Sequence, residues 1–533
     1  MPEARTAQTD LLVIGGGITG CGLAREAALR GLRVILLEKR DLAWGTSSRS
    51  TKLLHGGLRY LEQGHLGLVR EALREREALA RMAPHLARPI SFVVPTRRGG
   101  HPGPLTARIG LKLYDLLAGH SALPGGRTLP ADEIMALLPQ IARGDNGHSL
   151  IGALFFSDRR TDDARLTIAV ARDAAALGAA VRLRCEVTDL LERRGAVTGV
   201  RYLDHESGEA GSIEAALVIN ATGPWADRLR SMAGAPDRAV RPSRGTHLVL
   251  PDLGLSSAVM MEGSRRGQRL FALPWRGVTL LGTTDDDDAG DPDTVAPREE
   301  DVRQLLDQAR RQMPSANLTP RSIISSFAGL RPLVADRGDT VDVTREHRLL
   351  NTRGMLTLVG GKLTTWRSTA ERTIDYACAR LGRGARGRGA SAQRPLPGGA
   401  PRLSADDPRL ASLPAALREH LLGQYGSEAI EVAGLARADE EAARPIADGA
   451  ADIMAQVDFA VRHEMALCLE DVLKRRLSCG HLPAQMTAAA PAVAARMRRL
   501  RGWSAQREHQ EISALQTGLS VPGAETIPAF HRG

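Results

Sequence analysis

The residues whose chemistry is easiest to assign lie in one short segment, residues 44–64, WGTSSRSTKLLHGGLRYLEQG. Its hydroxyl and ammonium groups can hydrogen-bond a cofactor: Thr46, Ser47, Ser48, Ser50, Thr51 and Lys52. His55 can act as an acid or a base near neutral pH, and Arg59 and Tyr60 can bind an anion. Each of these side chains alone is typical of a solvated loop, but their clustering favours a site.

The segment that positions this loop is residues 10–38, which read as a strand, a glycine turn, a helix and a second strand. Gly15, Gly17 and Gly20 supply GxGxxG: the first permits a tight turn, the second lets a pyrophosphate approach the backbone, and the third lets helix and strand pack closely. The helix N-terminus directs its free amide groups at the anion. Glu38 ends the second strand, where an acid accepts hydrogen bonds from a ribose. The pattern predicts a dinucleotide site.

Composition excludes several classes of protein. The 533 residues suggest about three domains, and 43% hydrophobic residues are ample for a large core. Five cysteines without CxxC spacing predict neither a disulfide framework nor a metal site. A net charge of +10 favours anionic partners, whereas 3% aromatic residues make nucleic acid the least favoured partner. We find no signal peptide and no spanning segment, which predicts a cytoplasmic protein.

Strand patterns recur in the middle of the chain. Residues 179–223 read as a meander, with VRLRCEV as one strand, that closes with an apolar strand and the sequence ATG, ending at Gly223. Further strands follow in residues 241–328. Upstream of them, Asp158, Asp162 and Asp163 read as a solvated loop and a helix cap. Asp285 reads mainly as a solvated loop residue, with the alternative that the turn before it, residues 282–284, positions its side chain. Residues 355–365 give another apolar strand that runs into glycines, Lys362 and a helix start, which is a second corner suited to an anion.

Two basic, amphipathic helices are predicted at residues 66–86 and 105–120. Each helix either packs against a core or lies on a membrane surface. The occurrence of two such helices strengthens the membrane interpretation. Residues 382–408 are rich in Gly, Arg and Pro and predict a linker, after which the chain is mostly helical.

The motifs VIGGGITG, TSSRSTKLLHGGLRYLE, DDARL, NATGPW, GTTD, GLRPL and VGGKLTTW, in this order, resemble the FAD-dependent, respiratory glycerol-3-phosphate dehydrogenases. The resemblance implies an α/β fold: a Rossmann-like FAD-binding domain of the glutathione-reductase and glycine-oxidase superfamily, an interleaved α+β substrate domain and a helical C-terminal domain. The single GxGxxG, with flavin-type strands ending in ATG and GGK, favours FAD over NAD.

The resemblance also implies a division of the chain. FAD-binding parts are expected at 8–95, 151–240 and 326–381, a substrate- or membrane-facing insertion at 96–150, the substrate domain at 241–325, the linker at 382–408 and a helical cap at 409–533.

The family's site residues map onto this chain by motif. Cofactor contacts are expected from Gly15, Gly17, Gly20, Glu38, Thr46, Ser47, Ser48, Lys52, Val187, Gly223, Gly361, Lys362 and Thr364. Arg59, Tyr60 and Lys362 resemble the ligands of the substrate phosphate, and Arg331 and Arg345 those of the glycerol hydroxyls. The catalytic candidates are His55, as the general base, and Arg331, which can instead polarise the alkoxide; the sequence leaves both roles open.

The implied reaction converts sn-glycerol 3-phosphate to dihydroxyacetone phosphate and passes electrons to a membrane quinone. An oxidase that uses dioxygen and releases hydrogen peroxide shares these motifs. A non-catalytic flavin sensor is disfavoured because it would not need the set of Arg59, Arg331, Arg345 and Lys362. We expect a protein on the inner face of the cell membrane, bound to an anionic lipid surface, and we allow for a homodimer.

Overall fold

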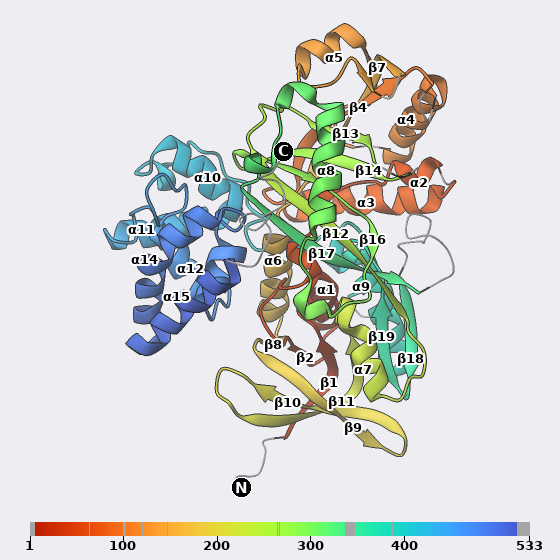
Figure 1. The fold of residues 1–533 in the computed structure, drawn as a ribbon. Coiled ribbons are helices and arrows are strands. Elements are labelled where there is room, and N and C mark those ends of the chain that lie inside the picture. The colour runs from red at the N-terminus through yellow and green to blue at the C-terminus, as the bar shows by residue number, and fades with distance from the viewer. Residues whose placement is uncertain are drawn as a thin grey trace.

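The computed structural model describes residues 6–62, 64–99, 103–119, 121–145, 148–263, 265, 267–335, 347–384 and 387–519. The chain forms two large β-sheets and a separate group of C-terminal helices (Figure 1). No helix among these residues combines the length and apolar character needed to cross a bilayer.

The first sheet is built around β1 (Thr6–Ile14), which pairs in parallel with β2 (Val34–Leu37) on one side and β11 (Ala210–Asn220) on the other. The strand order is β18-β19-β11-β1-β2-β8, with β10 and β9 continuing from β11. The remaining strands are β8 (Ala180–Arg182), β9 (Cys185–Arg193), β10 (Ala196–Asp204), β18 (Arg348–Thr352) and β19 (Met355–Val359).

Successive side chains of β1 point to opposite faces of the first sheet, and each face is covered by its own core. Leu11 and Val13 face a core shared with three helices: α1 (Ile18–Leu29), α6 (Asp163–Ala176) and α9 (Trp366–Arg380). Leu12 and Ile14 face the opposite core, which includes Leu229 of α7 (Ala226–Met232) and the β9–β10 hairpin. Both faces are covered, so β1 is apolar throughout its second half.

The second sheet has the order β16-β12-β15-β14-β13-β4-β7-β3, with β17 beside β12 and β5 and β6 beside β7. Its strands are β3 (Leu53–Leu54), β4 (Arg88–Arg97), β5 (Arg127–Pro130), β6 (Gly144–Asp145), β7 (His148–Arg160), β12 (Val240–Pro251), β13 (Ala258–Glu262), β14 (Arg269–Trp275), β15 (Val278–Gly282), β16 (Asp286–Asp287) and β17 (Ser325–Val334). β7, which the sequence analysis places in an FAD-binding part, therefore lies in the second sheet.

Helices cover both faces of the second sheet. α5 (Ala131–Leu137) and α8 (Glu299–Gln312) share one core with it, and α3 (Leu66–Met82) and α4 (Pro104–Ala118) share the other. α2 (Arg59–Glu62) is a single turn that precedes α3.

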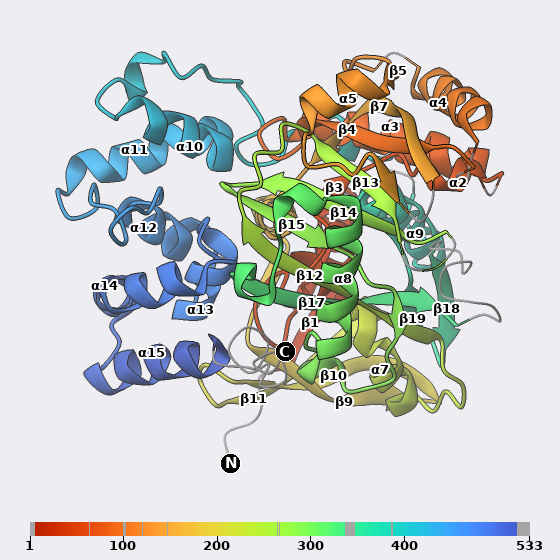
Figure 2. The same ribbon diagram turned by 45° about the horizontal axis from the view of Figure 1, so that its top comes forward.

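The C-terminal helices lie beside both sheets in two views (Figures 1 and 2). They are α10 (Ala415–Tyr425), α11 (Ala429–Ala438), α12 (Met454–His463), α13 (Leu469–Asp471), α14 (Pro483–Arg501) and α15 (Ala505–Leu519), with a π-helical turn at Val472–Arg476. The predicted linker is packed rather than free: Leu396 is buried, and the Arg25 guanidinium donates to the carbonyl of Ser391.

Two sequence expectations are wrong. VRLRCEV is not one strand, because β8 ends at Arg182 and β9 begins at Cys185, with Arg184 at a φ of 59° between them. Asp158 and Asp163 are buried rather than solvated, since Asp158 pairs with Arg76 and Asp163 with Lys52. Asp162 does cap α6, and its carboxylate accepts from the backbone of Arg165.

Candidate active site

A cavity of about 470 Å³ lies between the two sheets and is lined by residues of both. The first sheet contributes the loops after β1, β2, β11 and β19, which all meet at its carboxyl edge. The second sheet contributes side chains from β12, β14 and β17. Open α/β sheets bind ligands at this edge, and here the second sheet closes over it.

The glycines after β1 leave room for a ligand and for the helix. Gly15 has a φ of 112°, and a Cβ there would lie 2.7 Å from the carbonyl oxygen of Ala221. A Cβ on Gly20 would lie 1.8 Å from the carbonyl oxygen of Gly15, so this glycine permits close packing of helix on strand and does not line the cavity. Gly17 is the N-cap of α1 and has no side chain to satisfy the helix amides. The cradle therefore fits a pyrophosphate.

Glu38 lies at the end of β2 and lines the cavity. Its carboxylate accepts from the backbone amides of Gly16 (2.6 Å) and Arg40 (2.8 Å). Burial raises the pKa of Glu38, and these hydrogen bonds oppose the increase. Cys185, Glu186 and Val187 line the same part of the cavity. The arrangement fits the nucleoside end of a dinucleotide.

The side chains of the hydroxyl-rich loop, residues 46–52, fall into two groups: some line the cavity, and others stabilise the loop. Thr46 and Ser47 line the cavity, and Ser47 also accepts from the backbone amide of Ile18 at 3.0 Å. Ser48 and Lys52 do not line it. The Lys52 ammonium is buried and pairs with Asp163 at 2.6 Å, while it donates to the carbonyl of Ser48. The Lys52 side chain thus holds the loop through an internal ion pair, and its expected contact with the cofactor stays a prediction.

A second corner of the cavity contains Gly223, Gly361, Lys362 and Thr364. The Lys362 ammonium lies 3.9 Å from the centre of the Tyr60 ring and, within the part of the chain that the structure describes, has no carboxylate partner. His55 lines the same cavity, and its backbone amide donates to the Thr364 hydroxyl at 3.3 Å. The corner brings together a cation, an aromatic ring and an imidazole from distant segments.

Arg331 enters the cavity from β17 and is held by Asp285. Its guanidinium donates to the Asp285 carboxylate at 3.1 Å, to the Thr283 hydroxyl at 2.9 Å and to the Thr284 carbonyl at 3.1 Å. Asp285 is buried, so the turn positions this carboxylate and does not leave it solvated. The geometry fixes the direction of the guanidinium.

The sequence analysis missed two cavity residues, His247 and Arg49. His247 donates to or accepts from the Thr51 hydroxyl at 3.0 Å and stacks on Phe327 with ring centres 4.9 Å apart. Burial, with Arg331 nearby, lowers the pKa of His247 to about 3, so its ring is neutral at physiological pH. Arg49 stacks on Trp44 and has no carboxylate partner among the described residues.

Two predicted ligands fall outside this description. Arg345 lies outside the described residues, and the side chain of Arg59 is likewise not described. Their assignments therefore stay predictions.

Comparison with known proteins agrees with this geometry. Residues 10–367 match the family model described as FAD dependent oxidoreductase, and residues 389–508 match the C-terminal domain of alpha-glycerophosphate oxidase. A glycerol-3-phosphate dehydrogenase of Mycobacterium leprae is 38% identical over 95% of this chain and 87% of its own length. One from Synechocystis is 36% identical over 89% of each chain.

Solved structures agree as well. The glycerol-3-phosphate dehydrogenase of Bacillus halodurans, complexed with FAD, superposes with a TM-score of 0.78 at 29% identity, covering 96% of this chain and 94% of its own. L-alpha-glycerophosphate oxidase of Mycoplasma pneumoniae shares the fold over 70% of this chain, with a TM-score of 0.54 and 20% identity. With a cradle that fits FAD, the chain belongs to the family of FAD-dependent glycerol-3-phosphate dehydrogenases.

Proposed function

We propose that this chain oxidises sn-glycerol 3-phosphate to dihydroxyacetone phosphate and passes the electrons to a membrane quinone. The observation that carries the proposal is the corner of Lys362, Tyr60 and His55, which offers a cation and a proton acceptor in the cavity that fits FAD. Bound FAD supplies the acceptor of the hydride.

The phosphate is assigned to Lys362. A dianion needs cations that are not already neutralised, and Lys362 lacks a carboxylate partner among the described residues. Arg331 differs, because Asp285 already accepts from it. We therefore assign Arg331 to the glycerol hydroxyls, where a guanidinium held by Asp285 orients the carbinol oxygen without having to carry the phosphate charge. Arg59 and Arg345 remain proposed ligands from the sequence.

The proton of the reacting hydroxyl is assigned to His55. Hydride leaves the carbinol carbon only if this proton is also removed. His55 and His247 both line the cavity. His247 is a weak base because burial and the neighbouring cations lower its pKa to about 3. This favours His55 as the proton acceptor and leaves His247 to orient Thr51.

Membrane contact is assigned to α4. One face of this helix packs Ala107, Leu111 and Tyr114 inward. The opposite face exposes Leu105, Ile109 and Leu116, with 71%, 60% and 76% of each residue accessible. Arg108 and Lys112 are exposed beside them. An apolar stripe flanked by cations is suited to an anionic lipid surface, which would bring the protein to the quinone at the inner face of the membrane.

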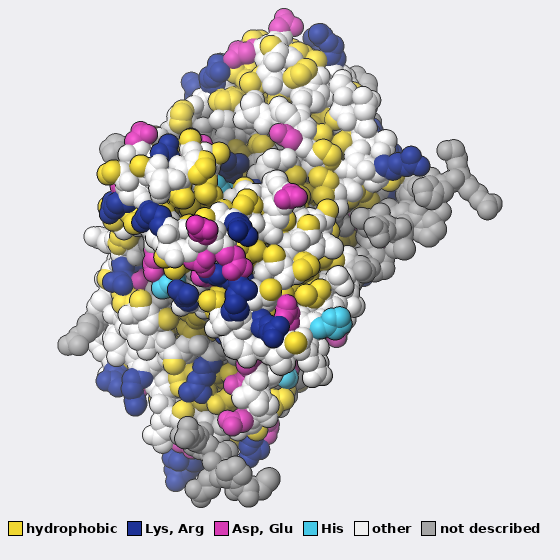
Figure 3. All heavy atoms as spheres, turned by 90° about the vertical axis from the view of Figure 1, so that its left-hand side faces the viewer, with side chains coloured by type: hydrophobic (Ala, Val, Ile, Leu, Met, Phe, Trp, Pro, Cys, Tyr) yellow, Lys and Arg dark blue, Asp and Glu magenta, His cyan; other side chains and the backbone are white. Residues whose placement is uncertain are grey.

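α3 and the arginines of α14 support membrane contact less. The apolar residues of α3 are buried apart from Leu66 and the partly exposed Leu68, and its Arg76 pairs with Asp158. On the face of the C-terminal domain, basic and acidic side chains are intermixed (Figure 3). The arginines of α14 are paired: Arg496 with Asp458, Arg498 with Glu508, Arg499 with Glu441 and Arg501 with Glu206.

The alternative acceptor is dioxygen, which is favoured by the match of residues 389–508 to a domain model named for an oxidase. The test is to supply purified holoenzyme with sn-glycerol 3-phosphate and either a water-soluble quinone or air-saturated buffer. We expect quinone reduction to exceed oxygen consumption at least tenfold. Stoichiometric hydrogen peroxide with little quinone reduction would assign the oxidase reaction instead. Failure to reduce either acceptor, or a redox dye, would contradict the whole proposal.

A further inference from the structure

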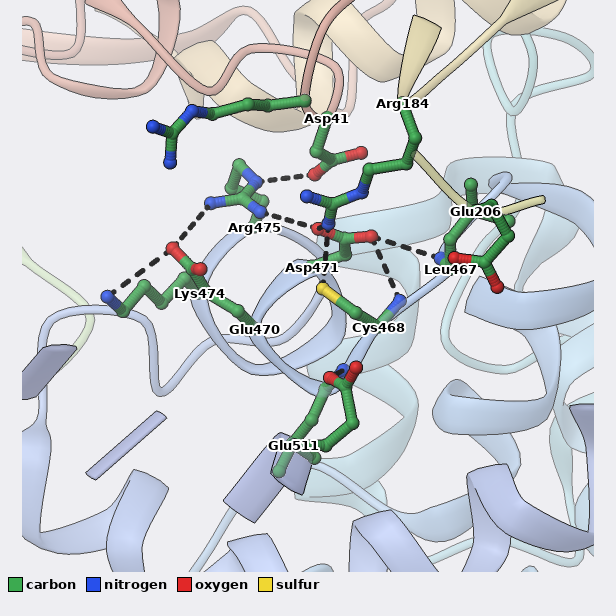
Figure 4. A network of polar contacts seen from close by, with 12 residues as sticks. Asp41, Arg184, Glu206, Leu467, Cys468, Glu470, Asp471, Lys474, Arg475 and Glu511 are labelled. Carbon is green, nitrogen blue, oxygen red and sulfur yellow. Dashed lines mark hydrogen bonds and ion pairs between the residues drawn. The ribbon is translucent and has the colours of Figure 1, made fainter. Parts of the chain in front are cut away.

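The C-terminal helices meet the FAD-binding part through a buried group of charges that we call the Asp41 network: Asp41, Arg184, Asp471, Arg475 and Arg476. Figure 4 labels the first four of these residues. Arg475 donates to the Asp41 carboxylate at 2.5 Å. Arg476 donates to both Asp41 oxygens, one of them at 2.8 Å. Asp41 and Arg476 are fully buried, so this contact is shielded from solvent.

Asp471 joins the network to a second segment. One of its carboxylate oxygens accepts from Arg475 and from Arg184, both at 2.8 Å. The other accepts from the backbone amides of Leu467 and Cys468 at 3.0 and 3.1 Å. Although burial raises the pKa of Asp471, Arg184 and Arg475 lower it below its ordinary value. The carboxylate is therefore ionised and fixed in place.

Asp41 and Arg184, the two network residues outside the C-terminal domain, each lie next to a chain segment that forms a wall of the cavity. Three residues after Asp41 the chain reaches Trp44, which lines the cavity, and the amide of Ala43 donates to the Gly16 carbonyl at 3.0 Å. Arg184 precedes the cavity residues Cys185, Glu186 and Val187.

These two walls are themselves joined by the backbone. The amide of Arg184 donates to the Arg40 carbonyl at 3.1 Å, and that of Cys185 donates to the Glu38 carbonyl at 2.9 Å. Both walls thus flank Glu38, at the end of the cavity that fits the ribose of a dinucleotide.

We propose that the C-terminal domain is a clamp on the adenosine half of FAD. Asp471, Arg475 and Arg476 act as positioning residues: they contact no cavity atom but fix the loop after Asp41 and the segment after Arg184 against each other. The assignment goes beyond the proposed reaction, because it concerns cofactor retention and holds whichever electron acceptor is used.

The charges give a second reason for the coupling. Arg49 lines the cavity, and its pKa is lowered to about 10, mainly by burial and also by the nearby charge of Arg475. Asp41 shares the neutralisation of Arg475 with Asp471 and Glu470, and it is the carboxylate partner of Arg476. When the Asp41 carboxylate is removed, Arg475 keeps two carboxylates and Arg476 loses its own, so one more positive charge is left uncompensated near this residue of the cofactor wall.

The test is Asp41→Asn in the full-length holoenzyme, with FAD release followed by the rise of flavin fluorescence at a temperature where far-UV circular dichroism shows a folded chain. We expect release to accelerate about tenfold or more, the order expected when a buried charge-assisted hydrogen bond is lost. At saturating FAD the turnover number should return to near the wild-type value, because the chemistry is unaffected.

The matched control is Glu428→Gln. Glu428 accepts from Arg172 of α6 at 2.7 and 2.8 Å, so this pair also joins the C-terminal domain to the rest, but neither residue lines the cavity. Equal acceleration of FAD release in the control would mean that any loosening of the interface has this effect, and would overturn the clamp.

Three further variants keep the proposal testable if Asp41→Asn misfolds. Arg184→Gln changes only the second wall, at a side chain that is partly exposed, and should also accelerate release. Arg476→Lys keeps the charge and should restore part of the retention lost in Arg476→Gln. Unchanged FAD release in folded Asp41→Asn or Arg184→Gln would refute the proposal.

Discussion

At the scale of single residues, the cavity separates two kinds of cation. Arg331 is neutralised by Asp285, whereas Lys362 faces an aromatic ring and has no described carboxylate partner. A paired guanidinium directs hydrogen bonds without adding much net charge, and a lone ammonium adds charge without fixed direction. Replacing Lys362 and replacing Arg331 should therefore change different kinetic properties of the enzyme.

Lys362→Ala should raise KM for sn-glycerol 3-phosphate roughly 10- to 100-fold, since one charge-assisted hydrogen bond contributes about 1.5 to 3 kcal/mol. Lys362→Arg should retain most of the affinity. The measurement is steady-state kinetics with a redox dye, using glycerol as the substrate that lacks phosphate. An equal loss with glycerol would show that Lys362 does not bind the phosphate.

Arg331→Ala should lower kcat/KM by at least roughly 10- to 100-fold while FAD stays bound, because its contacts lie on the second sheet and not on the glycine cradle. The flavin absorbance ratio and dye-linked kinetics check the two parts. Arg241→Ala is the control, since this arginine pairs with Asp287 on the neighbouring strand but does not line the cavity. Loss of flavin from Arg331→Ala would assign the residue a structural role.

At the scale of elements, α4 has an apolar residue set on each of two faces, and only one set is buried. Replacing Arg108 and Lys112 with Glu should weaken binding to anionic vesicles roughly 10- to 100-fold, because each cation near such a surface contributes about 1 kcal/mol. Quinone reduction on vesicles should fall with it, and the dye-linked rate in solution should not. Vesicle sedimentation measures the binding.

The control for this prediction makes the same charge change elsewhere. Arg498 and Arg499 of α14 are exposed and paired with Glu508 and Glu441, and their double replacement by Glu should leave vesicle binding nearly unchanged. If both double variants lose binding equally, net charge and not α4 directs the protein to the lipid.

The individual helices and strands show how much of the fold could be predicted from the sequence. β1, α1 and β2 are encoded locally, by apolar runs and glycines within thirty residues, and the dinucleotide site followed from them. FAD as its occupant followed only with the later strands that end in ATG and GGK. The break at Arg184 could not be predicted, because the side chain is held by Asp471, 287 positions away. The ion pair of Lys52 could not be predicted for the same reason: its partner Asp163 is 111 positions away. Motif spacing does not reveal such ion pairs.

At the scale of the whole molecule, stability should fall as pH falls below about 6.5. Burial lowers the pKa of His85 and of His247 to about 3. The ordinary histidine pKa is about 6.5, so between these values the unfolded chain binds protons that the folded chain does not. The unfolded state therefore gains protons on acidification, and the free energy of unfolding decreases.

The measurement is urea unfolding between pH 7.5 and 5.5. His85→Gln and His247→Gln should each reduce the pH dependence by about one proton. An unaltered slope in both buried-site variants would show that these rings are protonated in the folded protein.

The distance along the chain between Asp41 and Arg476 also bears on biosynthesis. The two residues are 435 positions apart, and ribosomes add about 5 to 20 residues per second. Roughly 20 to 90 seconds therefore separate the synthesis of the glycine cradle from that of the arginines that close its far end. The nascent chain presents an incomplete nucleotide site throughout this interval, so tight flavin loading should be among the last events in the maturation of the enzyme.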